Sequence, residues 1–130
     1  MSWLRCGSGG AAKPPMITCE LVGRSTGYYQ QNAVVYYTAT EDCLLIASAG
    51  GATVQDKALS LGISSSGGTA IGYSVQGASQ GPNTAAALRI VKVKAGTSVT
   101  FSAGGTSSTA NSPYALVVHV IKNIPNLWDD

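Results

Sequence analysis

The strongest catalytic pattern in this chain is a serine within a glycine-rich pentapeptide. Gly77-Ala78-Ser79-Gln80-Gly81 matches G-x-S-x-G, in which the serine is a nucleophile at a turn between a strand and a helix. Here Pro82-Asn83 follows in place of a helical segment, and no acidic residue lies between Ser79 and His119 to complete a triad in that order. We therefore interpret the pentapeptide as a loop and predict that the protein is not an enzyme.

The remaining residues show no pattern typical of a metal or cofactor site. His119 is the only histidine, and no paired cysteine or histidine spacing typical of zinc sites occurs. The six acidic residues include the adjacent pairs Glu41-Asp42 and Asp129-Asp130, which are typical of a turn and a solvated end. We expect no metal and no cofactor. As a base or ligand His119 lacks partners in the sequence, whereas it suits a strand at an interface, which is the interpretation we favour.

Cysteine usage does not indicate a disulfide framework. Cys6, Cys19 and Cys43 are odd in number and widely spaced. Cys19 and Cys43 lie in apolar runs, so we predict small buried side chains there and a free thiol at Cys6.

Composition excludes several partners. Charged residues make up 11% of the 130 residues, against about 25% in an average globular domain. A net charge of +2 provides no basic surface for nucleic acid. No run of about 18 apolar residues is present, so we predict no membrane span. The N-terminal residues lack the apolar stretch of a signal peptide, which predicts assembly in a cytoplasm.

Short apolar runs separated by Gly, Ser, Asn and Pro predict an all-β domain over residues 16–123. The alternation is clearest at Leu59, Leu61 and Ile63, and it recurs at Ile71, Tyr73 and Val75. About eight such strands must close into a sandwich or barrel to protect their edges. No internal repeat indicates a propeller or solenoid.

Two local features carry more detailed predictions. Within 86–94, Leu88 and Ile90 point one way and Val91 and Val93 the other, so we expect a β-bulge near Ile90–Val91. Ala95-Gly96 separates this run from the alternating Val99, Phe101 and Ala103, which favours a β-hairpin.

The last strand, 114–122, reads YALVVHVIK and is apolar on both faces. Such a strand lies centrally in a sheet or is covered by another subunit. We predict that Val117, His119 and Ile121 form a subunit interface, because an apolar face is not left in water.

Two further segments are candidates for binding a partner, and each has two interpretations. The sequence of residues 1–15 predicts an extended Gly-rich arm. Its candidate anchors on a neighbouring protein are Trp3, Leu4, Arg5 and Cys6. The alternative is a disordered terminus. The cluster Tyr28, Tyr29, Gln30, Gln31 and Asn32 suits either the edge of a core or the binding of sugar or protein. Residues 124–130 are expected to be a C-terminal tail.

Three segments together resemble known proteins. They are the Cys-Gly-Ser-Gly-Gly arm, the V-x-V-x-A-G-T-S-V-T-F segment from Val91 to Phe101, and the apolar strand from Tyr114 to Ile121. The combination is similar to small bacteriophage virion proteins with jelly-roll domains, such as head decoration, head-fibre and tail-appendage proteins. The hairpin and last strand also resemble the trimeric heads of tumour necrosis factor and C1q.

The resemblance implies an antiparallel jelly-roll β-sandwich, a homotrimer and a structural role on a virion assembled in the host cytoplasm, with capsid or tail proteins as partners. The alternative is a receptor-binding or carbohydrate-binding module that uses loops 24–32 and 76–84, with a host-surface glycan as ligand.

Overall fold

The computed structural model describes residues 16–27, 31–52, 59–78, 84–107 and 114–128. These form eight strands: β1 (Thr18–Gly27), β2 (Ala33–Thr38), β3 (Cys43–Ala52), β4 (Leu59–Ser66), β5 (Thr69–Ala78), β6 (Thr84–Val93), β7 (Ser98–Ser107) and β8 (Tyr114–Lys122). No described segment is helical, and none is a helix with the length and hydrophobicity needed to cross a membrane. The prediction of an all-β chain of about eight strands is confirmed.

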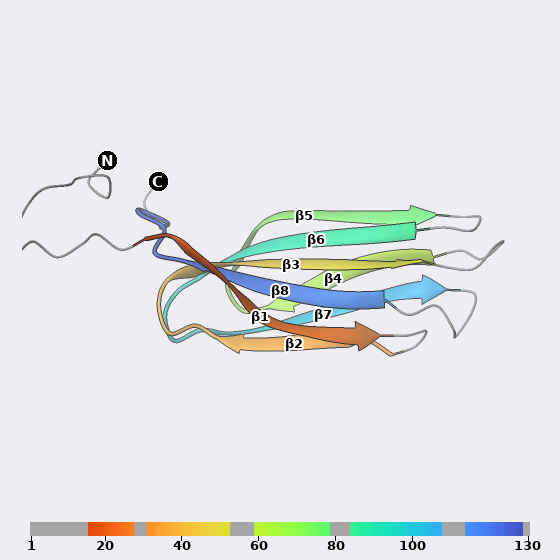
Figure 1. Cartoon of the computed structure of the whole chain (residues 1–130), viewed down its shortest axis with the longest axis horizontal. Coiled ribbons are helices and arrows are strands. Elements are labelled where there is room, and N and C mark those ends of the chain that lie inside the picture. Colours follow the sequence, from red (N-terminus) through yellow and green to blue (C-terminus); the bar gives the residue numbers. More distant parts are fainter. Residues whose placement is uncertain (1–15, 28–30, 53–58, 79–83, 108–113, 129–130) are drawn as a thin grey trace, which may run out of the picture.

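The strands make a sandwich of two antiparallel sheets (Figure 1). The larger sheet has the order β1-β8-β3-β6-β5, and the smaller has the order β4-β7-β2. The sheets join where Leu59–Leu61 of β4 pair with Gln76–Ala78 of β5. Each strand of the first half pairs with its mirror counterpart of the second half: β1 with β8, β2 with β7, β3 with β6 and β4 with β5. This is the strand order of a jelly roll.

The core lies between the two sheets and is built from inward-facing side chains of β2, β3, β4, β6, β7 and β8, with Val22 of β1 packed against it. Phe101 on β7 is the largest fully buried side chain, and the next largest are Leu45, Leu61, Leu116 and Val91. Because side chains alternate across a strand, Val99, Phe101 and Ala103 are all buried, as the sequence predicted. The side chains between these core positions therefore form the two outer faces of the sandwich.

Strand β1 begins and strand β8 ends at the same end of the sandwich (Figure 1). The Asn123 side-chain amide donates to the Met16 carbonyl at 2.9 Å, which joins the two ends. Strands β1, β3, β5 and β7 all end at the opposite end of the molecule.

A glycine pair forms the turn between β4 and β5. Gly67 and Gly68 both have positive φ, 86° and 70°, a region that favours glycine. A Cβ on Gly68 would lie 2.8 Å from the Lys92 carbonyl oxygen and 2.5 Å from a Val91 methyl carbon. Gly96, in the turn between β6 and β7, has φ 87° with nothing within 4 Å of such a Cβ.

These two glycines provide a matched test of packing against backbone conformation. We expect Gly96→Ala to lower the free energy of unfolding by about 1–2 kcal/mol, because only left-handed strain is added. Gly68→Ala adds overpacking against β6, so we expect a loss of about 3–5 kcal/mol. Urea unfolding of the two variants measures this difference, and equal losses would show that the turn does not pack on β6.

The prediction of a β-bulge near Ile90–Val91 is correct about the place and wrong about the strand. The pairing of β6 with β3 runs without a shift from Thr84 to Val93, so β6 itself has no bulge at Ile90–Val91. The odd-numbered residues of β6 simply face the core, with the half-buried Arg89 among them. The irregularity at this place is in the partner strand, because the pairing of β5 with β6 shifts between Ala70 and Gly72, which are opposite Val91 and Ile90. Another shift lies between Leu21 and Gly23 of β1.

Ala95-Gly96 does not close a β-hairpin either. The Thr97 amide donates to the Lys94 carbonyl at 3.1 Å, which makes a tight turn. However, β6 pairs with β3 and β5 in one sheet, whereas β7 pairs with β2 and β4 in the other. The turn therefore carries the chain between the two layers, and the Asp42 side chain supports it by accepting from the Ala95 amide at 2.9 Å.

Exposure corrects two further predictions. Cys19 is exposed, because it faces outward from the larger sheet opposite Ile121. Ile71 and Tyr73 are 54% and 73% exposed, since β5 loses its pairing with β4 beyond Gln76 and carries a bulge at Ile71. The predicted half-buried alternation of β5 is therefore wrong at these two residues.

Candidate functional site

The two outer faces of the sandwich have opposite chemistry. The outer face of the smaller sheet, here called the hydroxyl face, carries Val34, Tyr36, Thr38, Gly62, Ser64, Ser66, Ser98, Thr100, Ser102 and Gly104. The outer face of the larger sheet, here called the outer apolar face, carries mainly apolar side chains, with Ser48 between Val117 and Leu88; the others are Leu21, Leu44, Ile46, Ile90, His119 and Ile121. One face therefore suits water and the other suits protein contact.

The outer apolar face is organised in rows across the strands, which lie side by side in Figure 1. Its middle row crosses β1, β8, β3, β6 and β5 through Leu21, His119, Ile46, Ile90 and Gly72. Leu21 is 49% exposed, and its row neighbours on β8, β3 and β6 are half-buried by the side chains around them. Directly opposite side chains on neighbouring strands lie about 5 Å apart, so this row is continuous.

The three residues predicted for a subunit interface all lie on this face. Strand β8 is central in its sheet, between β1 and β3, and its inner residues Leu116 and Val118 are fully buried in the core. Val117, His119 and Ile121 alternate with these core positions and point away from the sandwich. Strands β1 and β3 therefore cover both edges of β8, but they leave its outer face uncovered.

Charge lies at the margins of the outer apolar face. Arg24 is opposite Val117 on β1, and Lys92 is opposite Leu44 on β6. No acidic side chain occupies the described positions of its middle row. An apolar centre with a polar rim is the arrangement of protein interfaces.

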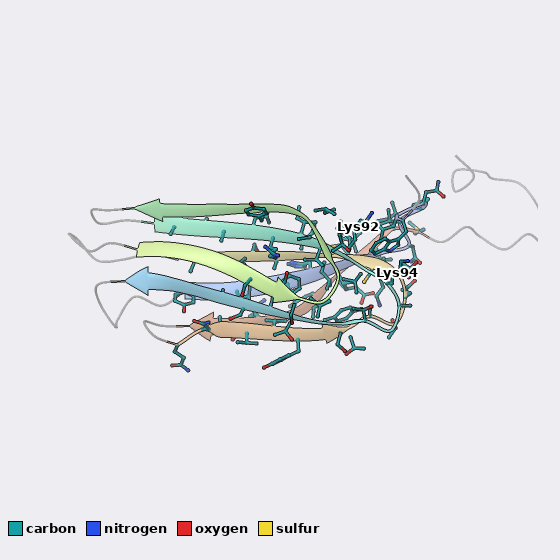
Figure 2. The ribbon with its side chains drawn as sticks, turned by 180° about the vertical axis from the view of Figure 1, so that it is seen from behind. Lys92 and Lys94 are labelled. Atoms are coloured by element: carbon teal, nitrogen blue, oxygen red, sulfur yellow. The ribbon has the colours of Figure 1, made fainter. Side chains whose placement is uncertain are left out.

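The C-terminal segment packs against the end of β6. Lys92 and Lys94, labelled in Figure 2, place their ammonium groups 4.6 and 5.0 Å from the centre of the Trp128 ring. The Lys92 ammonium also donates to the Leu127 carbonyl at 3.1 Å. Positive φ at Asn123 and Asn126 turns the chain back toward these lysines. Cation–π contacts and this hydrogen bond hold the described part of the predicted tail, 124–128.

A second cation lies on the inner face of β6. The Arg89 Nε donates to the Ser65 hydroxyl at 2.6 Å, and its guanidinium lies 5.9 Å from the Tyr73 ring centre. These contacts link β6 to β4 and β5 where the two sheets diverge. These two contacts explain why the half-buried Arg89 guanidinium is tolerated here, and no catalytic role is needed to explain it.

The predicted ligand loop is partly described. The Gln31 carbonyl accepts from the Tyr114 hydroxyl at 2.8 Å, so Gln31 has a structural contact. Gly27 leaves room for the Tyr114 ring beside it. Asn32 lies at the edge of the hydroxyl face, where its amide donates to the Ser102 hydroxyl at 3.1 Å. Tyr28, Tyr29 and Gln30 lie outside the described residues.

Other sequence-based candidates also fall outside the described residues. These are the arm residues Trp3, Leu4, Arg5 and Cys6, and Ser79 of the G-x-S-x-G pattern. Among the residues that are described, no group of three or more His, Cys, Asp or Glu side chains is placed to hold a metal ion.

The two described thiols differ in environment. Burial raises the pKa of Cys43, and Glu41 and Asp42 raise it further, while Lys122 opposes them. Since the thiolate is the nucleophile, a raised pKa combined with burial makes Cys43 unreactive. Cys19 is exposed on β1.

We expect alkylation to separate these thiols. In a Cys6→Ser background, iodoacetamide at pH 8 should modify Cys19 in the native protein and leave Cys43 free. Both should react in denaturant, because unfolding removes the burial of Cys43. Peptide mass spectrometry reads out each site, and native labelling of Cys43 at the rate of Cys19 would contradict the buried position.

Comparison with known proteins was made by sequence and by structure. No protein-family model and no curated protein matches the chain. Its structure is similar to a solved structure described as the tripod (BppUct-A-L) from the baseplate of bacteriophage Tuc2009. The match has a TM-score of 0.51 at 16% sequence identity, and it covers 94% of this chain and 78% of that chain. The two chains share a fold. At this identity the match concerns the fold, over almost the whole of this chain.

Proposed function

We propose that this chain is a non-enzymatic structural protein of a bacteriophage virion and that it assembles as a homotrimer through the outer apolar face. The observation that carries the proposal is the contrast between that face and the hydroxyl face of the same sandwich. A second copy of the chain is the partner that supplies a matching apolar surface. Around a threefold axis, His119 and Ile46 of each copy would be removed from water together with their apolar neighbours.

The structural neighbour supports the virion setting. Its described origin is a phage baseplate, and the shared fold covers 94% of this chain. Among the capsid-decoration, head-fibre and tail-appendage roles that the sequence resemblance implied, a baseplate neighbour favours the tail appendage. We propose this location, with other tail proteins as partners.

The arm is the proposed attachment element. Met16, where the described chain begins, lies at the end of the sandwich that also carries the C-terminal segment. An arm over residues 1–15 that leaves from this end can contact a neighbouring protein while the opposite end points away. Trp3, Leu4, Arg5 and Cys6 are the proposed anchors.

A chain that starts at Met16 tests this attachment. We expect its melting temperature to match that of the full chain within a few degrees, because the core lies within 33–120. We also expect it to fail to enter particles that lack the native protein. Incorporation at the full-length level would contradict the role of the arm, and the full chain supplied in parallel is the control.

The alternative is a receptor-binding or carbohydrate-binding module acting through loops 24–32 and 76–84. Their described strand ends, Gly27 and Ala78, lie at the same end of the molecule but on β1 and β5, the two margins of the larger sheet. Three strands separate them, so a ligand that bridged both would span about 20 Å.

A further inference from the structure

A shallow hollow of about 340 Å³ opens on the hydroxyl face. It lies over β4 and β7, beside the start of β2, and it faces away from the core. The residues that line it are Asn32, Gly62, Ile63, Ser64, Ser102 and Gly104. A hollow of this size can hold one ring-sized ligand, and its shallow shape leaves the outer side of that ligand in water.

Two glycines and one amide shape the hollow. Gly62 of β4 and Gly104 of β7 are directly opposite in register, so the floor is backbone without side chains. The Asn32 side chain lies across Gly104, where a Cβ would come within 2.8 Å of its Oδ1. The Asn32 amide is held in place by its 3.1 Å hydrogen bond to the Ser102 hydroxyl. The wall of the hollow is therefore an oriented amide rather than a free side chain.

The polar groups around the hollow are neutral. The Ser64 hydroxyl donates to the Ser102 carbonyl at 3.4 Å and retains lone pairs that can accept. Asn32 Oδ1 is a further acceptor. None of the outer-face positions described on β2, β4 and β7 carries a charged side chain. Such a surface offers little to a phosphate or carboxylate, and it matches a ligand whose own groups are hydroxyls and amides.

An exposed aromatic ring lies on the same face. Tyr36 is 73% exposed and is opposite Thr100, one position diagonal from Ser102. A diagonal neighbour lies about 7–8 Å away, within reach of an aromatic side chain. Its ring can cover the apolar face of a sugar while the amide and hydroxyls contact the edge.

We propose that this hollow binds a neutral saccharide, with Asn32, Ser64 and Ser102 as polar contacts and Tyr36 as the aromatic contact. The site lies on the opposite side of the sandwich from the outer apolar face. Saccharide binding and homotrimer formation are therefore independent, and either can fail without the other.

Titration followed by amide NMR tests the site in the full chain. The probes are D-glucose and N-acetyl-D-glucosamine, with D-glucose 6-phosphate and D-glucuronate as charged counterparts. We expect a neutral sugar to shift the amide signals of Gly62, Ser64, Ser102 and Gly104, with a dissociation constant of about 1–10 mM, as is usual for a ligand of this size.

Variants locate the binding. Asn32→Ala and Gly104→Ala, the second of which displaces the Asn32 amide, should each weaken binding about tenfold or more. Thr38→Ala, on the same face near the other end of β2, should leave it unchanged. The proposal is overturned if neither neutral sugar shifts these signals, if the shifts survive unchanged in Asn32→Ala, or if the charged counterparts bind more tightly than the neutral sugars.

Discussion

Replacing Phe101 by alanine is expected to lower the free energy of unfolding by about 3–5 kcal/mol. The ring is fully buried between the sheets, and the strands on both sides of β7 fix its backbone. Truncation removes the apolar area that the ring buries and leaves a cavity that a two-layer sandwich cannot collapse. Since small domains are stable by only about 5–15 kcal/mol, this change consumes a large part of the total.

Chemical unfolding monitored by circular dichroism measures this loss. Phe101→Leu, which keeps most of the apolar volume, should cost clearly less than the alanine variant. Tyr36→Ala provides the exposed control and should change stability by about 0.5 kcal/mol or less. If Phe101→Ala unfolded at the same denaturant concentration as Tyr36→Ala, the core would not be centred on β7.

A second large effect is expected from a charge in the middle of the outer apolar face. His119→Asp places a carboxylate between Leu21 and Ile46, with no cation in the same row. The monomer should keep its fold, because this side chain lies outside the core. The trimer, however, would bury three carboxylates without partners, each at a cost of about 3–5 kcal/mol. We therefore expect association to weaken by at least about a thousandfold.

Ser66→Asp is the matched control for this variant. It adds the same charge to an exposed strand position on the opposite outer face. Sedimentation velocity of both variants at equal concentration should show monomers for His119→Asp and an unchanged oligomer for Ser66→Asp. An unchanged oligomer in His119→Asp would move the interface away from β8.

Much of the fold could be predicted from alternation alone. Leu61, Ile63, Val99 and Phe101 are buried in the phase that the sequence indicated, because the sandwich covers the inner face of β4 and β7. Alternation does not state which strands pair. The turn at Ala95-Gly96 has the composition of a hairpin, yet it crosses between sheets, since β6 pairs with β3 and β5 whereas β7 pairs with β2 and β4.

The error at Ile90–Val91 has a related cause. A bulge in β6 is required only if all its large apolar residues share one buried face. The structure has an unbroken strand with apolar residues on both faces, and the outward-facing Leu88 and Ile90 belong to the outer apolar face. The same two-sided pattern in Leu44, Leu45 and Ile46 was a visible signal of that surface.

The candidate interface was predictable in part for this reason. Val117, His119 and Ile121 follow from the two-sided apolar character of the last strand. Their neighbours Leu21, Ile46 and Ile90 come from three other strands, and only the register brings them into one row. The hollow beside Asn32 could not be predicted from the sequence, because Gly62 and Gly104 lie opposite each other only through the pairing of β4 with β7.

The molar mass of the full chain in solution tests the central claim most directly. Light scattering coupled to size exclusion, at micromolar concentration and physiological salt, should give three times the 13.2 kDa of the single chain. A mass equal to one chain would contradict the account, because the outer apolar face would then remain exposed to water in the protein alone.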